Sequence, residues 1–338
     1  MNNIEQKIKE FEIWYNTQLP HHEASVRFFS ELIATIPKVE TVSGRTKNYE
    51  ECISKFKRKY LPLINPDDNT YRISEYLTDL IGIRAICSYS EDVNEIKRSL
   101  HKYFREIEIT DKSNLLEKTD DKFGYKSLHL QLVLKSRLKG LPEAGKYKNI
   151  IIELQVRTVI QDAWSILDHK IKYKKSIPQN LKRRINRLSA LFEIADDEFL
   201  NIQKEISNEE NKVSKRLKKG SKIEKSKTLD VFRFLFVALK YFPDYNFIEY
   251  KVDGFVQELL LQKHNFTEGE LNDALQKNLL FVGSIEQSIK QQLNPYTKIR
   301  YCLYKSDNNG FEAILTPHQK EVFIGFSNKK QVQINKLS

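Results

Sequence analysis

Short stretches rich in β-branched residues constrain the fold of this chain most. They lie at residues 81–89, 105–110, 127–135 and 148–158, and a helix-like segment at 91–103 separates the first two. Stretches of this length and composition are typical of strands, and their alternation with a helical pattern indicates a sheet covered by helices. We therefore predict a mixed α and β domain whose sheet lies within about residues 40–158.

Helical patterns flank this predicted sheet on both sides. Apolar residues recur at helical spacing over residues 2–36, where Pro20 is expected to break the first helix from the second. A basic helix is expected at about 47–60. The helical period returns after Thr158, and Pro178 is expected to open a long helix that reaches about Lys219.

A basic segment follows the long helix. Residues 212–227 hold eight basic residues against one acid, Glu224, a composition that favours a linker or a frayed helix end. We therefore predict a first domain at 1–211, a linker at 212–227 and a mostly helical domain at 228–338. The last domain is expected to have helices near 252–263, 267–278 and 283–293 and two short strand-like segments near 299–304 and 311–325. Contact of the basic segment with nucleic acid is the alternative to a solvated linker.

Composition excludes several classes of protein. The 338 residues are too many for one ordinary core, and 40% hydrophobic residues argue against general disorder. No apolar run approaches the roughly 18 residues of a membrane-spanning helix, and the N-terminus lacks the pattern of a secretion signal, so we expect a cytoplasmic protein without a membrane partner. Three scattered cysteines offer neither a disulfide framework nor a zinc site. The net charge of +11 favours phosphate-bearing partners.

The clearest chemical signal is the apolar strand at residues 150–158. Alternation places Glu153, Gln155 and Arg157 on one face of this strand. A carboxylate, an amide and a guanidinium in a buried strand need partners or a ligand to offset their desolvation. An internal row of salt bridges or a solvated sheet face would explain the same pattern.

A second strand repeats this geometry. Tyr125, Ser127, His129 and Gln131 share one face of the segment that begins at Gly124. Tyr125 lies where a loop enters the strand, so its ring is placed to stack on a planar ligand. Asp79, just before the strand at 81–89, supplies a second carboxylate that we expect to meet Glu153. Two carboxylates, with water and phosphate oxygens, are ligands that Mg²⁺ prefers.

Basic residues precede these strands. Six of them stand against Glu50 and Glu51 over fifteen positions, namely Arg45, Lys47, Lys55, Lys57, Arg58 and Lys59. A solvated surface would also explain such a run. The chain has neither a GxxxxGK[ST] loop nor a GxGxxG fingerprint, so any phosphate would have to be bound by side chains.

Five blocks in sequence order resemble the RelA/SpoT family of pyrophosphate-transferring nucleotide synthetases. They are Gly44–Lys47 with Lys55–Lys59, Asp79–Arg84, Gly124–His129, Glu153–Thr158 and Ala163–Lys174. The resemblance covers about residues 1–205 and is to small members that lack a hydrolase domain. It implies an α+β fold, a nucleotidyltransferase-like mixed β-sheet flanked by helices, with the mostly helical domain as an addition.

The resemblance also implies a reaction, which is transfer of the β,γ-pyrophosphate of ATP to the ribose 3′-hydroxyl of GDP or GTP with release of AMP. The implied ATP-binding residues are Arg45 and Arg84 for adenine and Lys47, Lys55 and Arg58 for the phosphates. Asp79 and Glu153 are the implied Mg²⁺ ligands, and Glu153 is the implied base for the 3′-hydroxyl. The implied acceptor-binding residues are Tyr125, His129, Gln155, Arg157 and His169, whereas Trp164 is expected in the core.

Three functions remain open from the sequence. The first is a guanosine alarmone synthetase. The second keeps the chemistry but modifies the 3′ end of tRNA, as in some toxin–antitoxin or phage-defence relatives. The third is a catalytically silent nucleotide-binding regulator, which the presence of both carboxylates disfavours. ATP and GDP or GTP are the expected partners, with tRNA as the alternative acceptor and a homo-oligomer as a possible assembly.

Overall fold

The computed structural model describes residues 3–65, 70–111, 127–135, 138, 140–141, 143–172 and 178–335. It divides into two compact units, residues 1–203 and 204–338, and the division falls inside one long helix. Among the described residues, no helix combines the length and the apolar character needed to cross a membrane.

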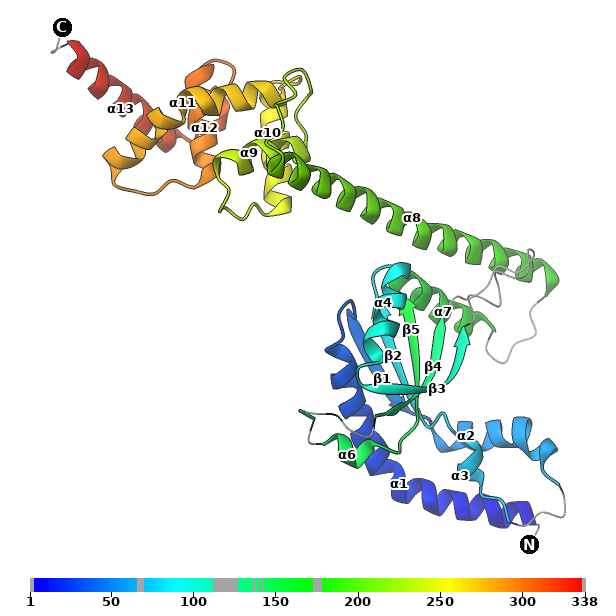
Figure 1. Ribbon diagram of the computed structural model, residues 1–338. Helices are drawn as coiled ribbons and strands as arrows, with labels where there is room; N and C mark the ends of the chain where they lie inside the picture. The colour runs from blue at the N-terminus through cyan, green and yellow to red at the C-terminus, as the bar shows by residue number, and fades with distance from the viewer. Residues whose placement is uncertain are drawn as a thin grey trace. The chain divides into compact units, whose positions relative to one another are not determined.

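The first unit is built on a five-stranded mixed sheet (Figure 1). Its strands are β1 (Thr41–Thr46), β2 (Ile81–Cys87), β3 (Phe104–Asp111), β4 (Leu128–Leu134) and β5 (Ile152–Thr158). In the order β1-β2-β5-β4-β3, only β2 and β5 run parallel, and the other neighbours are antiparallel. The predicted mixed sheet is confirmed, and β1 is a strand that the sequence pattern did not predict.

Helices cover the apolar face of the sheet. Helices α1 (Asn3–Ala34) and α4 (Ser90–Leu100) share one core with the strands, and the short α6 (Ala144–Tyr147) adds Tyr147 to it. Phe29 of α1, Ile96 of α4 and Leu154 of β5 are fully buried there. Because strand residues alternate between faces, burial of this set directs the polar residues of β2, β4 and β5 to the opposite face.

Helix α1 is continuous, so the predicted break at Pro20 is wrong. Pro20 lies inside the helix and has no backbone N–H to donate to the carbonyl of Asn16. Both residues are on the exposed side of the helix, where water can replace the missing donor. The helix is held on both sides of the proline, since Phe11 packs in a second core and Phe29 packs under the sheet. Tertiary burial thus outweighs the local preference for a break.

The second core of the first unit lies under the segment that follows β1. It contains α2 (Tyr49–Lys55), a π-helical turn at Phe56–Tyr60, a 3₁₀ turn at Leu61–Leu63 and α3 (Ile73–Tyr76). Asn48 caps α2 by accepting the backbone N–H of Glu51 at 2.8 Å. Phe56, Tyr71 and Leu77 bury their side chains against Phe11 and Tyr15 of α1.

Gly44 of β1 is required for the packing of α1 on the sheet. A Cβ at this position would lie 2.6 Å from Cγ1 of Val26 and 2.8 Å from Oγ of Ser30. We expect Gly44→Ala to lower the free energy of unfolding by about 1–3 kcal/mol, because the helix must shift to make room. Urea unfolding measures this change. Gly145→Ala is the matched control, since a Cβ there meets no atom within 4 Å, and an equal loss in both variants would contradict the packing argument.

Two helices follow the sheet. Helix α7 (Val159–Lys172) begins directly after β5, and α8 (Gln179–Lys218) is the long helix predicted from Pro178. Trp164 of α7 is 5% exposed and packs on Phe192 of α8 with ring centroids 5.3 Å apart, which confirms its place in the core. Residues 212–218, the start of the predicted linker, are the last part of α8.

The second unit is helical. After the end of α8 it contains α9 (Val231–Tyr241), α10 (Glu249–Gln262), α11 (Glu268–Ile289), α12 (Pro295–Ser306), a 3₁₀ turn at Glu312–Ile314 and α13 (Pro317–Asn335). Its core is apolar, with Phe234, Leu259, Leu275 and Ile299 fully buried. This arrangement confirms the mostly helical C-terminal part of the predicted fold class.

The two strand-like segments predicted in this unit are wrong, because α12 and α13 occupy them. Asn294 caps α12 and Pro295 occupies its first turn, and the buried Ile299, Cys302 and Leu303 follow at helical spacing. Thr316 caps α13 through Gln319. The predicted helices near 267–278 and 283–293 are joined in α11, which continues through Gly283.

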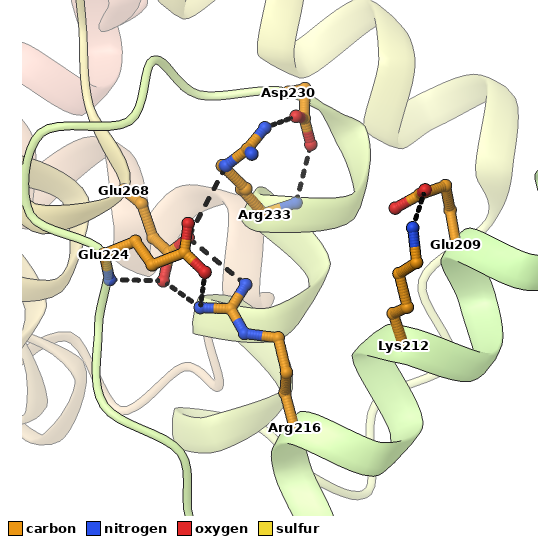
Figure 2. Close-up of polar contacts among 7 residues, drawn as sticks. All are labelled: Glu209, Lys212, Arg216, Glu224, Asp230, Arg233 and Glu268. Atoms are coloured by element: carbon orange, nitrogen blue, oxygen red, sulfur yellow. Dashed lines mark hydrogen bonds and ion pairs between the residues drawn. The ribbon is translucent and has the colours of Figure 1, made fainter.

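A buried carboxylate connects α8 to the second unit's core. Glu268, at the start of α11, is fully buried and accepts hydrogen bonds from Arg216 at 2.6 and 3.3 Å and from the backbone N–H of Glu224 at 3.0 Å (Figure 2). Arg233 lies 3.8 Å away. The guanidinium of Arg216 also stacks over the ring of Phe236 at 3.8 Å.

We expect Glu268→Gln to lower the free energy of unfolding by about 3 kcal/mol, because it leaves two guanidinium groups beside a neutral amide. Thermal or urea unfolding of the full chain measures the loss. Glu321→Gln, at an exposed position of α13, is the control and should change stability by less than about 0.5 kcal/mol. Equal stability of the two variants would show that the buried ion pair contributes little.

Candidate active site on the polar face of the sheet

The strand register brings the predicted polar residues onto one face. Glu153 of β5 lies beside Gly82 of β2 and Gln131 of β4, and Gln155 lies between Arg84 and His129. Arg157 continues the same row. The alternation predicted from the sequence is therefore confirmed for the described part of both strands.

Asp79 lies two residues before β2 and binds two lysines. Its Oδ2 accepts from Nζ of Lys47 in a very short contact and from Nζ of Lys55 at 2.7 Å, while its own side chain is only 11% exposed. The backbone of Lys47 is fixed, since its carbonyl accepts from the Tyr15 hydroxyl at 2.8 Å and its N–H donates to Leu80 at 2.8 Å. Two ammonium groups around one carboxylate leave an excess positive charge at this end of the sheet.

The two lysines determine the ionisation of Asp79. Burial raises the pKa of this carboxyl, but the hydrogen bonds and charges of Lys47 and Lys55 outweigh burial and hold the pKa below its ordinary value. Oδ1 of Asp79 is buried and has no hydrogen-bond partner among the described residues. One oxygen of an ionised carboxylate is therefore unsatisfied in a place that is already positively charged.

Glu153 is the second carboxylate of the site. Its Oε1 contacts Nδ1 of His129 at 3.0 Å and accepts from Nε2 of Gln155 at 3.4 Å. The hydrogen bond from His129 lowers the pKa of Glu153, burial opposes it, and the negative charge of Asp79 raises it. The meeting of Asp79 and Glu153 at one cation stays a prediction, and Asp79 acts on Glu153 as the weakest of these influences.

The His129 contact makes a testable prediction about Glu153. In His129→Leu the largest cause of the lowered pKa is removed, so we expect the Glu153 pKa to rise. A carboxyl whose pKa is lower in the folded than in the unfolded state stabilises the protein above the unfolded-state pKa. This stabilisation is lost as the pH falls through the folded-state pKa. The variant, with its higher folded-state pKa, should therefore lose stability at a higher pH during acid titration. Carbon NMR titration of the Glu153 carboxyl measures the midpoint. His101→Leu is the control, since His101 contacts Glu106, and a midpoint unmoved by His129→Leu would contradict the assignment.

An acidic residue that the sequence analysis did not single out joins the guanidinium groups. Asp162, in the first turn of α7, contacts Nη1 of Arg84 and Nη1 of Arg157, both at 3.0 Å. Arg157 also donates to Gln155 and to Oγ of Ser165. Burial, with repulsion from Arg84, lowers the pKa of Arg157 to about 10. The polar face is thus a network that runs from β2 across β5 to α7.

Gly82 leaves room in the middle of this face. It pairs with Arg45 of β1 on one side and Glu153 on the other, and a Cβ there would meet no atom within 4 Å. The Arg45 side chain is 72% exposed and lies 3.6 Å from Glu51. Arg45 and Arg84 occupy diagonal positions on neighbouring strands, so their side chains leave the same face of the sheet.

The sequence blocks also contain Arg58, Tyr125, His169 and Lys174. Arg58 is exposed and borders a surface hollow with Tyr49 and Lys57, and the structure does not bring it to Asp79. His169 is exposed on α7. Tyr125 lies outside the described residues, as does Lys174 of the fifth block.

The side chains of Asp79 and Glu153 are of the type that binds a hard divalent cation which takes few of its ligands from the protein. Within the described ranges, no group of three or more His, Cys, Asp or Glu side chains gathers as a metal cage would require. Mg²⁺ does not need such a cage, because one or two carboxylates with water and phosphate oxygens complete its shell. The unsatisfied Oδ1 of Asp79 and the carboxylate of Glu153 are donors of the kind that such an ion takes.

Comparison with known proteins identifies the region that carries this site. The model of the "Region found in RelA / SpoT proteins" matches residues 44–178. The GTP pyrophosphokinases YjbM and YwaC of Bacillus subtilis are each 28% identical to this chain, over 185 and 172 residues. These alignments cover 54% of this chain and 80% of YjbM, and 50% of this chain and 75% of YwaC.

Solved structures with a related chain include small alarmone synthetase 1 from Bacillus subtilis. It has a TM-score of 0.46 and 23% identity, and the match covers 58% of this chain and 99% of that one. The same synthetase bound to its product pppGpp has a TM-score of 0.46 and 24% identity, with 58% and 98% covered.

Residues 44–178, within the first unit, are therefore similar to the region found in RelA / SpoT proteins. The chain also resembles two GTP pyrophosphokinases, and both findings confirm the resemblance predicted from the sequence blocks. Residues 179–338 lie beyond the match.

Proposed function

We propose that the first unit is an ATP-dependent pyrophosphokinase that transfers the β,γ-pyrophosphate of ATP to the ribose 3′-hydroxyl of GDP or GTP. The relatives named GTP pyrophosphokinase support the reaction class. The observation that carries the proposal is the buried Asp79, bound by Lys47 and Lys55 and electrostatically coupled to Glu153. A charged pair of this kind in a positive environment suits a migrating pyrophosphate group.

Each side chain has a task in this reaction. Lys47 and Lys55 supply the charge that binds the triphosphate. Arg45 and Arg84 leave the same face of the sheet and are the proposed adenine contacts. Arg84 binds Asp162 through the edge of its guanidinium, which leaves the flat face for stacking on adenine. Mg²⁺ held by Asp79 and Glu153 would supply Lewis-acid stabilisation of the phosphate charge.

Glu153 is proposed as the base. It takes the proton of the 3′-hydroxyl as the bond from the 3′-oxygen to the β-phosphorus forms, and the bond from the β-phosphorus to the α-phosphate oxygen breaks to release AMP. His129 and Gln155 hold the Glu153 carboxylate in place. Tyr125 and His169 stay predicted acceptor contacts, and Arg58 stays a predicted phosphate contact.

The test follows the label from γ-labelled ATP. Purified protein with Mg²⁺ is incubated separately with GDP, GTP and deacylated tRNA, and the products are separated. We expect labelled guanosine 3′-diphosphates and an equal amount of AMP. Label on tRNA alone would contradict the nucleotide acceptor, and release of unlabelled AMP with free pyrophosphate only would contradict transfer.

Self-association also stays a prediction. The first unit exposes apolar side chains on α7 and α8, which are the surface that a second copy would cover, namely Leu167, Leu188, Leu191, Ile194 and Phe199.

A further inference from the structure

The second unit carries a surface of lysines outside the RelA/SpoT region. We call it the lysine surface, and its members are Lys212, Lys215, Lys218, Lys219, Lys222, Lys225 and Lys227. All seven are exposed. Of these, Lys212 pairs with Glu209 at 2.5 Å, and the other six form no ion pair with any residue that the structure describes. A positive surface of one sign therefore extends from the end of α8 into the following loop.

The acidic groups that follow Lys212 in the chain pair with arginines. Glu224, the only acid among residues 212–227, lies 3.7 Å from Arg216, and Arg216 is itself bound to the buried Glu268 (Figure 2). Asp230 contacts Arg233. Glu224, Asp230 and Glu268 thus pair with the two arginines, and among the described residues Glu209 alone pairs with a lysine of this surface.

The backbone that carries the lysines has a fixed shape. Gly220, with φ of 59°, ends α8 in a Schellman motif in which the N–H of Ser221 donates to Arg216 and that of Gly220 donates to Leu217. The loop beyond it is tied to α11, since the N–H of Glu268 donates to the carbonyl of Lys227 at 2.9 Å. The seven ammonium groups are therefore presented on an ordered support, which reduces the ordering cost of binding.

Packing between the loop and α11 gives further support. A Cβ at Gly269 would lie 2.7 Å from Cα of Lys225, so the two backbones are in direct contact. Leu229 donates its N–H to Phe266 at 2.7 Å. These contacts show that the segment predicted as a linker is anchored on the helical unit along its length.

The chemistry of the lysine surface favours one kind of partner. Its apolar residues are packed inward, with Val213 7% and Leu229 2% exposed and Leu217 and Ile223 against the same core. No apolar side chain is thus presented for insertion into a lipid surface. Residues 212–227 contain no aromatic residue, Asn or Gln that would stack on or read a base. Lysines alone contact phosphates as point charges.

We propose that the lysine surface binds the phosphodiester backbone of a nucleic acid without reading its bases. A regular row of phosphates matches several ammonium groups at once, and binding releases counterions in proportion to the phosphates neutralised. The proposal does not depend on the reaction of the first unit.

The experiment measures fluorescence anisotropy of a labelled single-stranded RNA of mixed sequence with the full chain over a range of salt concentrations. We expect a Kd between about 10⁻⁶ and 10⁻⁴ M near physiological salt, with log K falling linearly with log salt. The triple variant Lys215→Gln, Lys219→Gln and Lys222→Gln should bind at least about tenfold more weakly. Its salt slope should be shallower by about 2, at roughly 0.7 for each phosphate that the variant no longer neutralises.

A matched triple variant controls for overall charge. Lys240→Gln, Lys251→Gln and Lys277→Gln removes the same charge from exposed positions of the second unit and should change Kd by less than about twofold. Equal weakening in both triple variants would overturn the proposal, as would unchanged binding in the first. Because the surface lacks base- and sugar-reading groups, single-stranded DNA of the same length should bind within a few-fold of RNA.

Two other results would overturn the assignment. A tenfold or greater preference for RNA over DNA that disappears in the first triple variant would show readout beyond the phosphates. Tighter binding to vesicles of anionic phosphatidylglycerol than to either nucleic acid, abolished in the same variant, would identify a membrane surface instead. Thermal unfolding of both triple variants confirms that the compared proteins are folded.

Discussion

Asp79→Asn and Glu153→Gln are each expected to reduce pyrophosphate transfer by about 10³-fold or more. Charge stabilisation by a bound cation contributes several kcal/mol, and each 1.36 kcal/mol is a factor of ten in rate. Asp79 has a buried unsatisfied oxygen, and Glu153 is both its electrostatic neighbour and the proposed base. The loss should appear mainly in kcat, since both groups act on the reacting phosphate and hydroxyl.

Two controls make this result interpretable. Glu143→Gln removes an exposed carboxylate whose one ion pair within the described residues is with Lys146. This variant should keep kcat within about twofold of the unaltered chain. Circular dichroism and thermal unfolding report whether Asp79→Asn still folds, because Lys47 and Lys55 lose their counter-charge in that variant. Full activity in a folded Asp79 or Glu153 variant would contradict the proposed roles.

Lys47→Met and Lys55→Met are each expected to lower kcat/KM by about 10²-fold or more. One fixed cation or hydrogen-bond donor to the migrating group contributes on the order of 3 kcal/mol to the transition state. Both lysines converge on Asp79 and are mostly buried, so their charges are less screened than those of surface lysines. Initial rates at several ATP concentrations measure the effect.

The neighbouring Lys57 gives a matched control on the same segment. Lys57 is exposed on the turn after α2, and Lys57→Met should change kcat/KM by no more than a few-fold. The double variant of Lys47 and Lys55 should lose less than the product of the single losses, because both lysines act on one group. A loss in Lys57→Met equal to that in Lys55→Met would indicate a diffuse electrostatic effect.

Strand alternation predicted more of the sheet than of the surrounding structure. The apolar runs of β2, β4 and β5 were evident because these strands bury one full face. β1 gave no such signal, since it is an edge strand with mostly exposed residues and a glycine at position 44. The helices α12 and α13 were mistaken for strands because short apolar runs have no decisive period.

The sequence predicts which site residues share the face of one strand. It does not predict which residues tertiary contacts bring together. Glu153, Gln155 and Arg157 share a face by the alternation of β5 alone. Lys47 and Asp79 are 32 positions apart, and only the pairing of β1 with β2 brings them together. Asp162 was not singled out because its role depends on how α7 leaves β5.

The π-helical turn at Phe56–Tyr60 illustrates a local effect that the sequence pattern did not predict. It adds a residue to the turn after Lys55 and changes the direction of the side chains that follow. Lys55 precedes this turn and contacts Asp79 at 2.7 Å, whereas Arg58 lies within the turn and is exposed.

Binding of a divalent cation with nucleotide tests the central claim most directly. Electron paramagnetic resonance measures free Mn²⁺ when the protein is titrated in the presence of a non-hydrolysable ATP analogue. We expect Asp79→Asn and Glu153→Gln each to weaken Mn²⁺ binding by at least about tenfold, because each variant loses one carboxylate ligand. Glu143→Gln should bind as the unaltered chain does. Unchanged Mn²⁺ affinity in both folded site variants would contradict the shared cation site.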